Sequence, residues 1–176
     1  MSDSKKIPGI LLALLFLKSA PEDLPYSPRL TLQLVVFYVL SGIIVLQTTL
    51  APDDLYAGIL LGVAVQFAFA YTVLIALNKG ARFMQTFAAL IGISLLFNLL
   101  SWPVFSILAD NTAGESLMST MSLLFLLLIS WEVLVKAHIF KHALDMKMFA
   151  ALALSFSLFF ISLTLSQLLL PVEATG

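Results

Sequence analysis

The chain has 176 residues, of which 61% are hydrophobic and only 11% are charged, and its mean hydropathy is +1.06. A soluble domain has about a quarter of its residues charged, so this composition excludes a water-facing surface and predicts a membrane protein with several spans. The net charge of −1 provides no basic field, and we expect no nucleic-acid partner. Cysteine is absent, which excludes disulfides and thiolate metal sites.

Long uniform apolar runs carry this hydrophobicity. Backbone amides at membrane depth must be bonded within the protein, and runs of this length achieve that as helices, whereas the strands of a barrel would be shorter and would alternate. No Pro- or Gly-rich linker divides the chain. We therefore predict one all-α domain, a polytopic membrane bundle of five transmembrane helices preceded by a short N-terminal interfacial helix.

Residues 1–29 are predicted to be a cytoplasmic N-terminal segment. Its apolar run, 7–17, is too short to span, because as a helix it reaches ~17 Å against a ~30 Å hydrocarbon core. A signal peptide would place Lys18 at the −3 position of the best cleavage site, where a small residue is needed. We therefore favour an interfacial helix over 7–18 that also packs on the bundle. The sequence leaves open whether this helix lies in the membrane plane or re-enters the bilayer.

Three prolines make the rest of this segment a linker. Five long apolar runs follow, and they place the predicted spans at 30–50, 55–77, 83–108, 117–137 and 148–170. We expect Gly80 to stop the second span and Pro103 to bend the third. Residues 138–147 are predicted to form a polar connector, and 171–176 a short tail.

Lysine and arginine are confined to alternate connections. They occur in the N-terminal segment, at 78–82 and at 138–147, and they are missing from the turns at 51–54 and 109–116 and from the tail. By the positive-inside rule, the basic side is cytoplasmic. All nine basic residues fall on that side if Lys136 extends its ammonium group toward it. The prediction is a multi-pass bacterial inner-membrane protein with a cytoplasmic N-terminus and a periplasmic C-terminus.

Small and polar residues recur along single faces of the second, third and fifth spans. Helices in lipid associate through such residues, which allow close backbone approach and share hydrogen bonds. The helix-packing or partner face predicted in the second and third spans contains Gly58, Gly62, Gln66, Ser94, Asn98 and Ser101. The fifth span offers Ala151, Ser155, Ser162 and Ser166. A polar path between helices is one interpretation, but none of these groups is charged. We favour packing contacts, worth on the order of 0.6 kcal/mol each.

Glu132 and Lys136 are intramembrane charges of the fourth span, four residues apart, which is the spacing of a helical ion pair. A charge inside the membrane must pair, snorkel or face the bundle. One interpretation is a proton or ion relay, and the other is an ion pair at the membrane edge with Trp131 as the interfacial anchor. We favour the ion pair, because a path across the membrane needs charge at mid-depth and the predicted span puts Glu132 in its cytoplasmic third.

His138 and His142 are also four residues apart, and Asp145 would share their face on a continuing helix. This set could bind zinc or another divalent ion. Because Lys141 lies among them and no fourth ligand is identifiable, we favour a polar cytoplasmic face and predict neither a metal nor a cofactor. The sequence shows no Ser-His-acid pattern and no phosphate-binding Gly loop, so we predict no enzyme.

Two stretches, 78–105 and 128–147, combine basic, polar and aromatic residues in a distinctive order. The residues concerned are Gly80, Arg82, Gln85, Trp131, His138 and Lys141. Together with the predicted topology, they resemble the bacterial branch of the Yip family, small five-span proteins named for eukaryotic relatives that interact with Rab-type GTPases. The acidic-Leu-Tyr-Gly motif that eukaryotic members carry before their spans has no counterpart in that position here. The resemblance therefore implies the five-span fold but carries over no trafficking role and no catalytic site.

These observations lead to three functional hypotheses. The first is a non-enzymatic inner-membrane protein that binds or organises other membrane proteins or lipids, or that serves as a small subunit of a larger complex. Its partners would be the lipid bilayer and another membrane protein or a second copy of itself. The alternative is a transporter or channel component with a polar path near Glu132, Asn98 and Gln66. The third is a metal protein or membrane enzyme centred on His138, His142 and Asp145.

Overall fold

The structure is a computed structural model, and it describes residues 7–49, 54–110 and 112–170. These residues form helices and connecting turns, so the predicted all-α class is confirmed. The elements are α1 (Ile7–Leu15), the 3₁₀ turn η1 (Pro21–Asp23), α2 (Pro28–Thr49), α3 (Leu55–Ala76), the 3₁₀ turn η2 (Gly80–Arg82), α4 (Phe83–Leu108), α5 (Glu115–Leu144) and α6 (Met148–Leu169). Five of the described helices, α2 to α6, are long and apolar enough to cross a membrane. The predicted tail at 171–176 lies outside the described residues.

Most span boundaries lie close to the predicted ones, but α5 ends at Leu144 instead of 137. The predicted polar connector is therefore mostly helix, and only 145–147 join α5 to α6. Lys141 and His142 lie in the last turn of α5, where positive charge favours the helix dipole. The helix α4 contains Pro103 and continues across it to Leu108.

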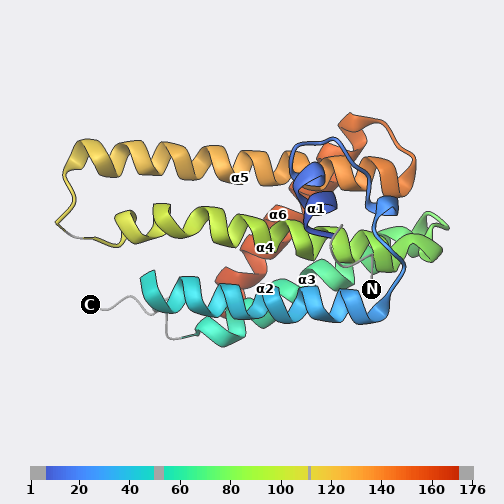
Figure 1. The fold of residues 1–176 in the computed structure, drawn as a ribbon, viewed down its shortest axis with the longest axis horizontal. Helices are drawn as coiled ribbons and strands as arrows, with labels where there is room; N and C mark the ends of the chain where they lie inside the picture. Colours follow the sequence, from blue (N-terminus) through green and yellow to red (C-terminus); the bar gives the residue numbers. More distant parts are fainter. Residues whose placement is uncertain (1–6, 50–53, 111, 171–176) are drawn as a thin grey trace.

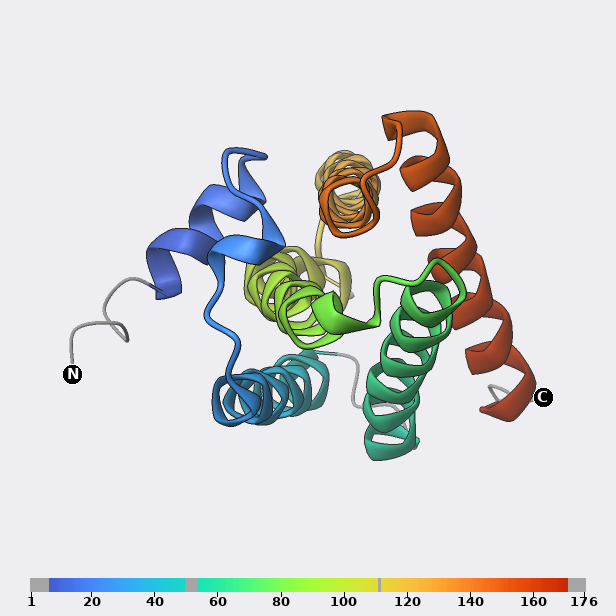
Figure 2. The same ribbon diagram turned by 90° about the vertical axis from the view of Figure 1, so that its right-hand side faces the viewer.

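The helix α4 lies at the centre of the bundle. Its residues from Thr86 to Ser94 are all buried, which requires neighbours on every side. Figure 2 shows α4 near the middle, with α2, α3, α5 and the N-terminal segment around it, and with α6 outside α3 and α5. In Figure 1, α2, α4 and α5 run side by side along the long axis.

The described connections define two ends of the bundle. Lys79 Nζ lies 2.7 Å from Asp145 Oδ2, and Arg82 Nη1 lies 3.0 Å from the same oxygen, so the α3–α4 and α5–α6 turns meet at one end. We name it the basic end. The opposite end, which we name the acidic end, carries Asp54 at the N-cap of α3 and Glu115 in the first turn of α5. The alternation of basic and acidic connections along the sequence therefore corresponds to the two ends of the bundle.

A left-handed residue closes the helix at the end of α3, and that residue is Asn78, with φ 57°, instead of the predicted Gly80. The amide of Lys79 then donates to the carbonyl of Leu74 at 2.7 Å, which satisfies a carbonyl at the helix end. Asparagine tolerates this conformation. Gly80 serves a different purpose, because a Cβ there would lie 2.9 Å from Ile75 Cδ1.

The helix α1 lies across the side of the bundle, against α4 and α5 (Figures 1 and 2). It is shorter than the predicted 7–18, and Leu11, Leu14 and Leu15 are buried. Its close approach depends on Gly92, where a Cβ would lie only 2.6 Å from Leu11 Cδ2. Gly92 is roughly 14 Å along α4 from its basic end at ~1.5 Å per residue, so α1 packs against the side of the bundle well away from that end.

Candidate functional site

An ion pair within α5 forms the centre of the candidate site. Lys136 Nζ lies 2.7 Å from Glu132 Oε1, and the side chains are 14% and 27% exposed, respectively. Helical side chains point toward the N-terminus of their helix, so Lys136 reaches back to Glu132. The ammonium group therefore extends away from the basic end. The prediction that all nine basic residues fall on one side assumed the opposite, namely that Lys136 extends its ammonium group toward that end.

The ion pair lies deeper than the sequence indicated. Glu132 is ~18 Å from the basic end of α5, Ser94 is ~17 Å from that end of α4, and Gln66 is ~15 Å from that end of α3, at ~1.5 Å per residue. Half of a hydrocarbon core is ~15 Å, so all three groups lie near mid-depth of their spans. The sequence ended the fourth span at 137 and therefore placed the pair in the cytoplasmic third of that span, whereas α5 continues to Leu144 and Glu132 lies nearer to its middle.

Ser94 connects the ion pair to a third helix. Its hydroxyl lies 3.2 Å from Glu132 Oε1 and 3.3 Å from Gln66 Oε1. A hydroxyl has one proton, so Ser94 donates to one of these oxygens at a time, and the charged carboxylate is the stronger acceptor. Gln66 is 5% exposed. Side chains from α3, α4 and α5 thus meet in one buried polar network.

Asn98 belongs to a second polar network, between α4 and α2. Its amide nitrogen lies 3.3 Å from the hydroxyl of Ser41, and Ser41 donates to the backbone carbonyl of Tyr38 at 2.9 Å. Ser101, predicted on the same face, is buried on α4. Gln66 and Glu132 therefore share a network that does not include Asn98, so the predicted convergence of all three is only partly present.

A small cavity between α5 and α6 adjoins the ion pair. It has a volume of about 80 Å³, and the polar groups in its wall are Glu132, Lys136, Ser155 and Ser162. Ser155 already donates to the carbonyl of Val133 at 2.7 Å and so ties α6 to α5. The remaining wall consists of apolar side chains.

Two larger grooves lie between α3 and α6. One has a volume of about 270 Å³, and its small and hydroxyl-bearing wall residues are Gly58, Gly62, Ser162 and Ser166. Because Ser162 also lines the cavity beside the ion pair, the two hollows adjoin. The other groove, of about 320 Å³, is lined mainly by apolar residues, and both grooves include Val65. The predicted partner face of α3 thus borders an open groove instead of a closed helix contact.

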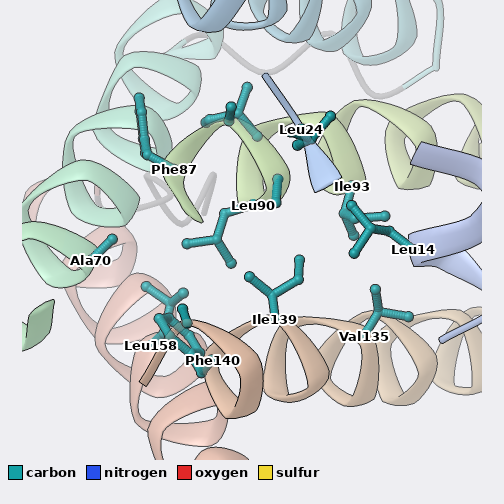
Figure 3. Close-up of a cluster of buried hydrophobic side chains, with 14 of the residues drawn as sticks. Leu14, Leu24, Ala70, Phe87, Leu90, Ile93, Val135, Ile139, Phe140 and Leu158 are labelled. Carbon is teal, nitrogen blue, oxygen red and sulfur yellow. The ribbon is translucent and has the colours of Figure 1, made fainter. Parts of the chain in front are cut away.

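A fully packed apolar layer lies between the ion pair and the basic end. Its members Ala70, Leu74, Leu90 and Phe140 are each 0% exposed. The ring of Phe140 also meets Phe69 edge-on, with 5.8 Å between ring centroids. Figure 3 shows Phe140 and Leu158 in the same buried cluster as Ala70 and Leu90.

The histidines and Asp145 do not assemble into one site. The ring centroids of His138 and His142 are 4.5 Å apart. Asp145, which adopts the left-handed conformation just after α5, instead directs its carboxylate to Lys79 and Arg82. The hydrogen bond from Lys79, and then that from Arg82, hold the pKa of the Asp145 carboxyl below its usual range. Among the described residues, no three His, Asp or Glu side chains are grouped as a metal ion would require.

Three donors hold the N-terminal segment by its backbone, and the sequence did not reveal this role. Trp131 Nε1 donates to the carbonyl of Leu15 at 3.0 Å, and His138 Nε2 lies 2.9 Å from the carbonyl of Ser19. Gln85 Nε2 donates to the carbonyls of Glu22 at 3.1 Å and Leu24 at 2.7 Å. The available signal was the presence of side-chain donors in helices that are otherwise apolar, where a polar group needs a partner.

The fold and this site define a multi-pass helical membrane protein with a mid-depth ion pair. No protein-family model matches the chain, and neither a curated protein nor a solved structure matches it.

Proposed function

We propose that this chain is a non-enzymatic integral membrane protein that binds another membrane protein, a second copy of itself, or a lipid. The observation that supports the proposal is the pair of grooves between α3 and α6, with volumes of about 270 and 320 Å³. Grooves within long apolar helices open toward hydrocarbon, and their walls gain dispersion contacts only when another chain fills them. Binding at these grooves is the proposed activity.

The composition of the smaller groove supports a helix or an acyl chain as its occupant. Gly58 and Gly62 face Ser162 and Ser166 across it, and such small residues allow close approach of a second backbone. The connections between spans are too short to form a separate binding domain. The positive-inside rule supports a bacterial inner-membrane location with the basic end in the cytoplasm, and the proposal includes this. It also includes membership of the bacterial Yip branch, which the resemblance in the sequence supports.

Mild extraction into native nanodiscs, followed by mass spectrometry of the retained molecules, tests this proposal. We expect a specific protein or lipid to remain bound to the native chain and to be lost from the G58L variant, because Gly58 lines the groove and a leucine side chain there would fill it. Gly62 is left unchanged, because a Cβ there would lie 3.3 Å from Tyr38 Oη and would disturb the packing of α3 on α2. The matched control is A57L, which changes an exposed alanine of the same helix. Equal retention by both variants would exclude this face as the binding surface.

One observation favours a second candidate function, a transporter or channel component. The Glu132–Lys136 pair lies near mid-depth and bonds to Ser94, and ionisable residues at that depth commonly mark ion or substrate pathways. The sequence argument against transport depended on the lack of such a charge. Proton flux into liposomes, followed with an internal pH-sensitive dye, is the test. We expect E132Q to abolish a flux that the native chain and an S157A control both support, and a native chain without flux above empty liposomes would reject this function.

A further inference from the structure

We propose that the cavity beside the ion pair and the adjoining groove of about 270 Å³ bind a lipophilic alcohol, which enters sideways from the hydrocarbon. The hydroxyl of this ligand lies between Glu132 and Lys136, and its hydrocarbon chain lies in the groove between α3 and α6. The inference rests on the proposed function, in which this groove binds a lipid, and it specifies the class of lipid.

The ion pair is partly uncovered at a depth where the surroundings are hydrocarbon. The side chains of Lys136 and Glu132 are 14% and 27% exposed, respectively, and both line the wall of the cavity. Polar and charged groups that face hydrocarbon without a partner are costly. A ligand that covers this pair with a polar group is therefore stabilised more here than at an apolar position on the bundle.

The polar groups of the cavity retain hydrogen-bonding capacity of both kinds. Glu132 Oε1 lies near both Lys136 Nζ and the Ser94 hydroxyl, whereas no described residue donates a hydrogen bond to Oε2. A lysine ammonium has three donors, and a hydroxyl both donates and accepts. One ligand hydroxyl can therefore donate to the carboxylate of Glu132 and accept from Lys136.

The size and charge of the cavity restrict the polar group that it takes. Its volume of about 80 Å³ holds roughly two or three groups the size of a water molecule at ~30 Å³ each, and a helix ~10 Å across does not fit. A carboxylate would place a second anion beside Glu132, which like-charge repulsion disfavours. A phosphate headgroup would have to carry its charge from the interface to mid-depth. A single neutral hydroxyl meets these conditions.

The groove suits the rest of such a ligand. Its wall is almost wholly apolar and includes Leu61, Val65 and Leu163. Ser162 lines both hollows, so a chain that begins at the cavity continues directly into the groove. There it gains dispersion contacts with walls that otherwise have no protein partner. One polar group on an otherwise hydrocarbon molecule is the chemistry of a long-chain alcohol.

Photo-crosslinking in proteoliposomes tests this inference. The probe is hexadecyl alcohol with a diazirine in its chain, and mass spectrometry locates the labelled residues after illumination. Unlabelled hexadecyl alcohol, its methyl ether and hexadecanoic acid serve as competitors. We expect the alcohol to displace the probe from the α6 residues that line the groove, 162–166. Phe160 is 57% exposed and does not line the groove, so its labelling should not be displaced.

The native chain should select the alcohol over both other competitors. We expect the ether, which cannot donate, and the acid, which brings a negative charge, each to require on the order of tenfold higher concentration for the same displacement, because hydrogen bonds to charged groups contribute affinity of this size. This comparison needs no substitution, so it is independent of the folding of any variant.

A pair of variants tests the role of the two charges. E132M/K136M removes both charges and keeps apolar side chains in their place, which is typically neutral or stabilising for a buried pair. It should bind the alcohol and the ether equally. The control S157A changes an exposed serine of α6 whose hydroxyl bonds to Ala153, and it should keep the native preference.

Equal displacement by the alcohol and the ether in the native chain, stronger displacement by the acid, or a preference retained by E132M/K136M would overturn the alcohol site. Saturable labelling of the groove would still be present in these cases, so the groove would remain a lipid-binding surface. Labelling of the groove that no competitor displaces would instead reject both the alcohol site and lipid as the occupant of the groove. The two failures are therefore distinguishable.

Discussion

Replacing Lys136 by methionine should destabilise the bundle, because it leaves the Glu132 carboxylate at mid-depth without its cation. Removing one member of a buried ion pair costs about 3–5 kcal/mol. The two side chains retain 14% and 27% exposure, and Ser94 still lies 3.2 Å from Glu132, so we expect the lower end, about 3 kcal/mol. For a chain of this length, that corresponds to a fall in Tm of about 6–12 °C.

Thermal unfolding in detergent micelles, followed by circular dichroism, measures this change. The informative comparison is E132M/K136M, in which both charges are removed and apolar side chains take their place. Such replacement of a whole buried pair is typically neutral or stabilising, so the double variant should recover most of the lost Tm. K141M, which changes a lysine in the last turn of α5, should shift stability by less than ~0.5 kcal/mol.

A K136M variant as stable as the native chain would refute the claim that the pair is desolvated. A double variant as unstable as K136M would refute the claim that the loss comes from the unpaired charge, and would indicate lost packing instead.

Three further predictions follow from contacts described above. D145N should lower Tm near neutral pH. Because the pKa of Asp145 is depressed in the folded chain, its contribution to stability is fully present above the unfolded pKa of ~3.9 and disappears as the pH falls through the folded pKa. The Tm difference between D145N and the native chain should therefore vanish in acid. G92A should cost about 1–3 kcal/mol of stability and displace α1, because its Cβ would lie 2.6 Å from Leu11 Cδ2. A red shift of tryptophan fluorescence should accompany the fall in Tm, and an unchanged spectrum and Tm would contradict the close packing of α1. F140A should cost about 3–5 kcal/mol and lower Tm, because truncation of this fully buried ring leaves a cavity in the apolar cluster; an unchanged Tm would contradict the packing of Phe140.

The sequence predicted the spans well because hydropathy is a local property of each segment. The bounds of α4 agree at both ends, and the ion pair at Glu132 and Lys136 follows from their helical spacing alone. The end of α5 was predicted too early because polar residues from His138 onward looked like a solvated connector. His138 is instead satisfied inside the fold by the carbonyl of Ser19, a contact across the chain that no local pattern reveals.

The same limit applies to the polar faces. Ser94 and Asn98 are one turn apart and were predicted to act together, yet Ser94 bonds to α3 and α5 whereas Asn98 bonds to α2. Which neighbour each side chain meets depends on how the helices are arranged around α4, and helical periodicity gives only the direction. The stop at Asn78 was missed because asparagine and glycine both tolerate the left-handed conformation, so residue type alone does not decide between Asn78 and Gly80.

The contacts of the N-terminal segment have a consequence for the order of assembly in the membrane. Trp131 follows its acceptor, Leu15, by 116 residues, and His138 follows Ser19 by 119. At a synthesis rate of ~5–20 residues per second, α1 leaves the ribosome on the order of ten seconds before its donors exist. It is too short to be inserted as a span, so it must wait at the membrane surface until α4 and α5 are in place. The docking of α1 is thus delayed until α5 has been made, and it reports that α4 and α5 have come together.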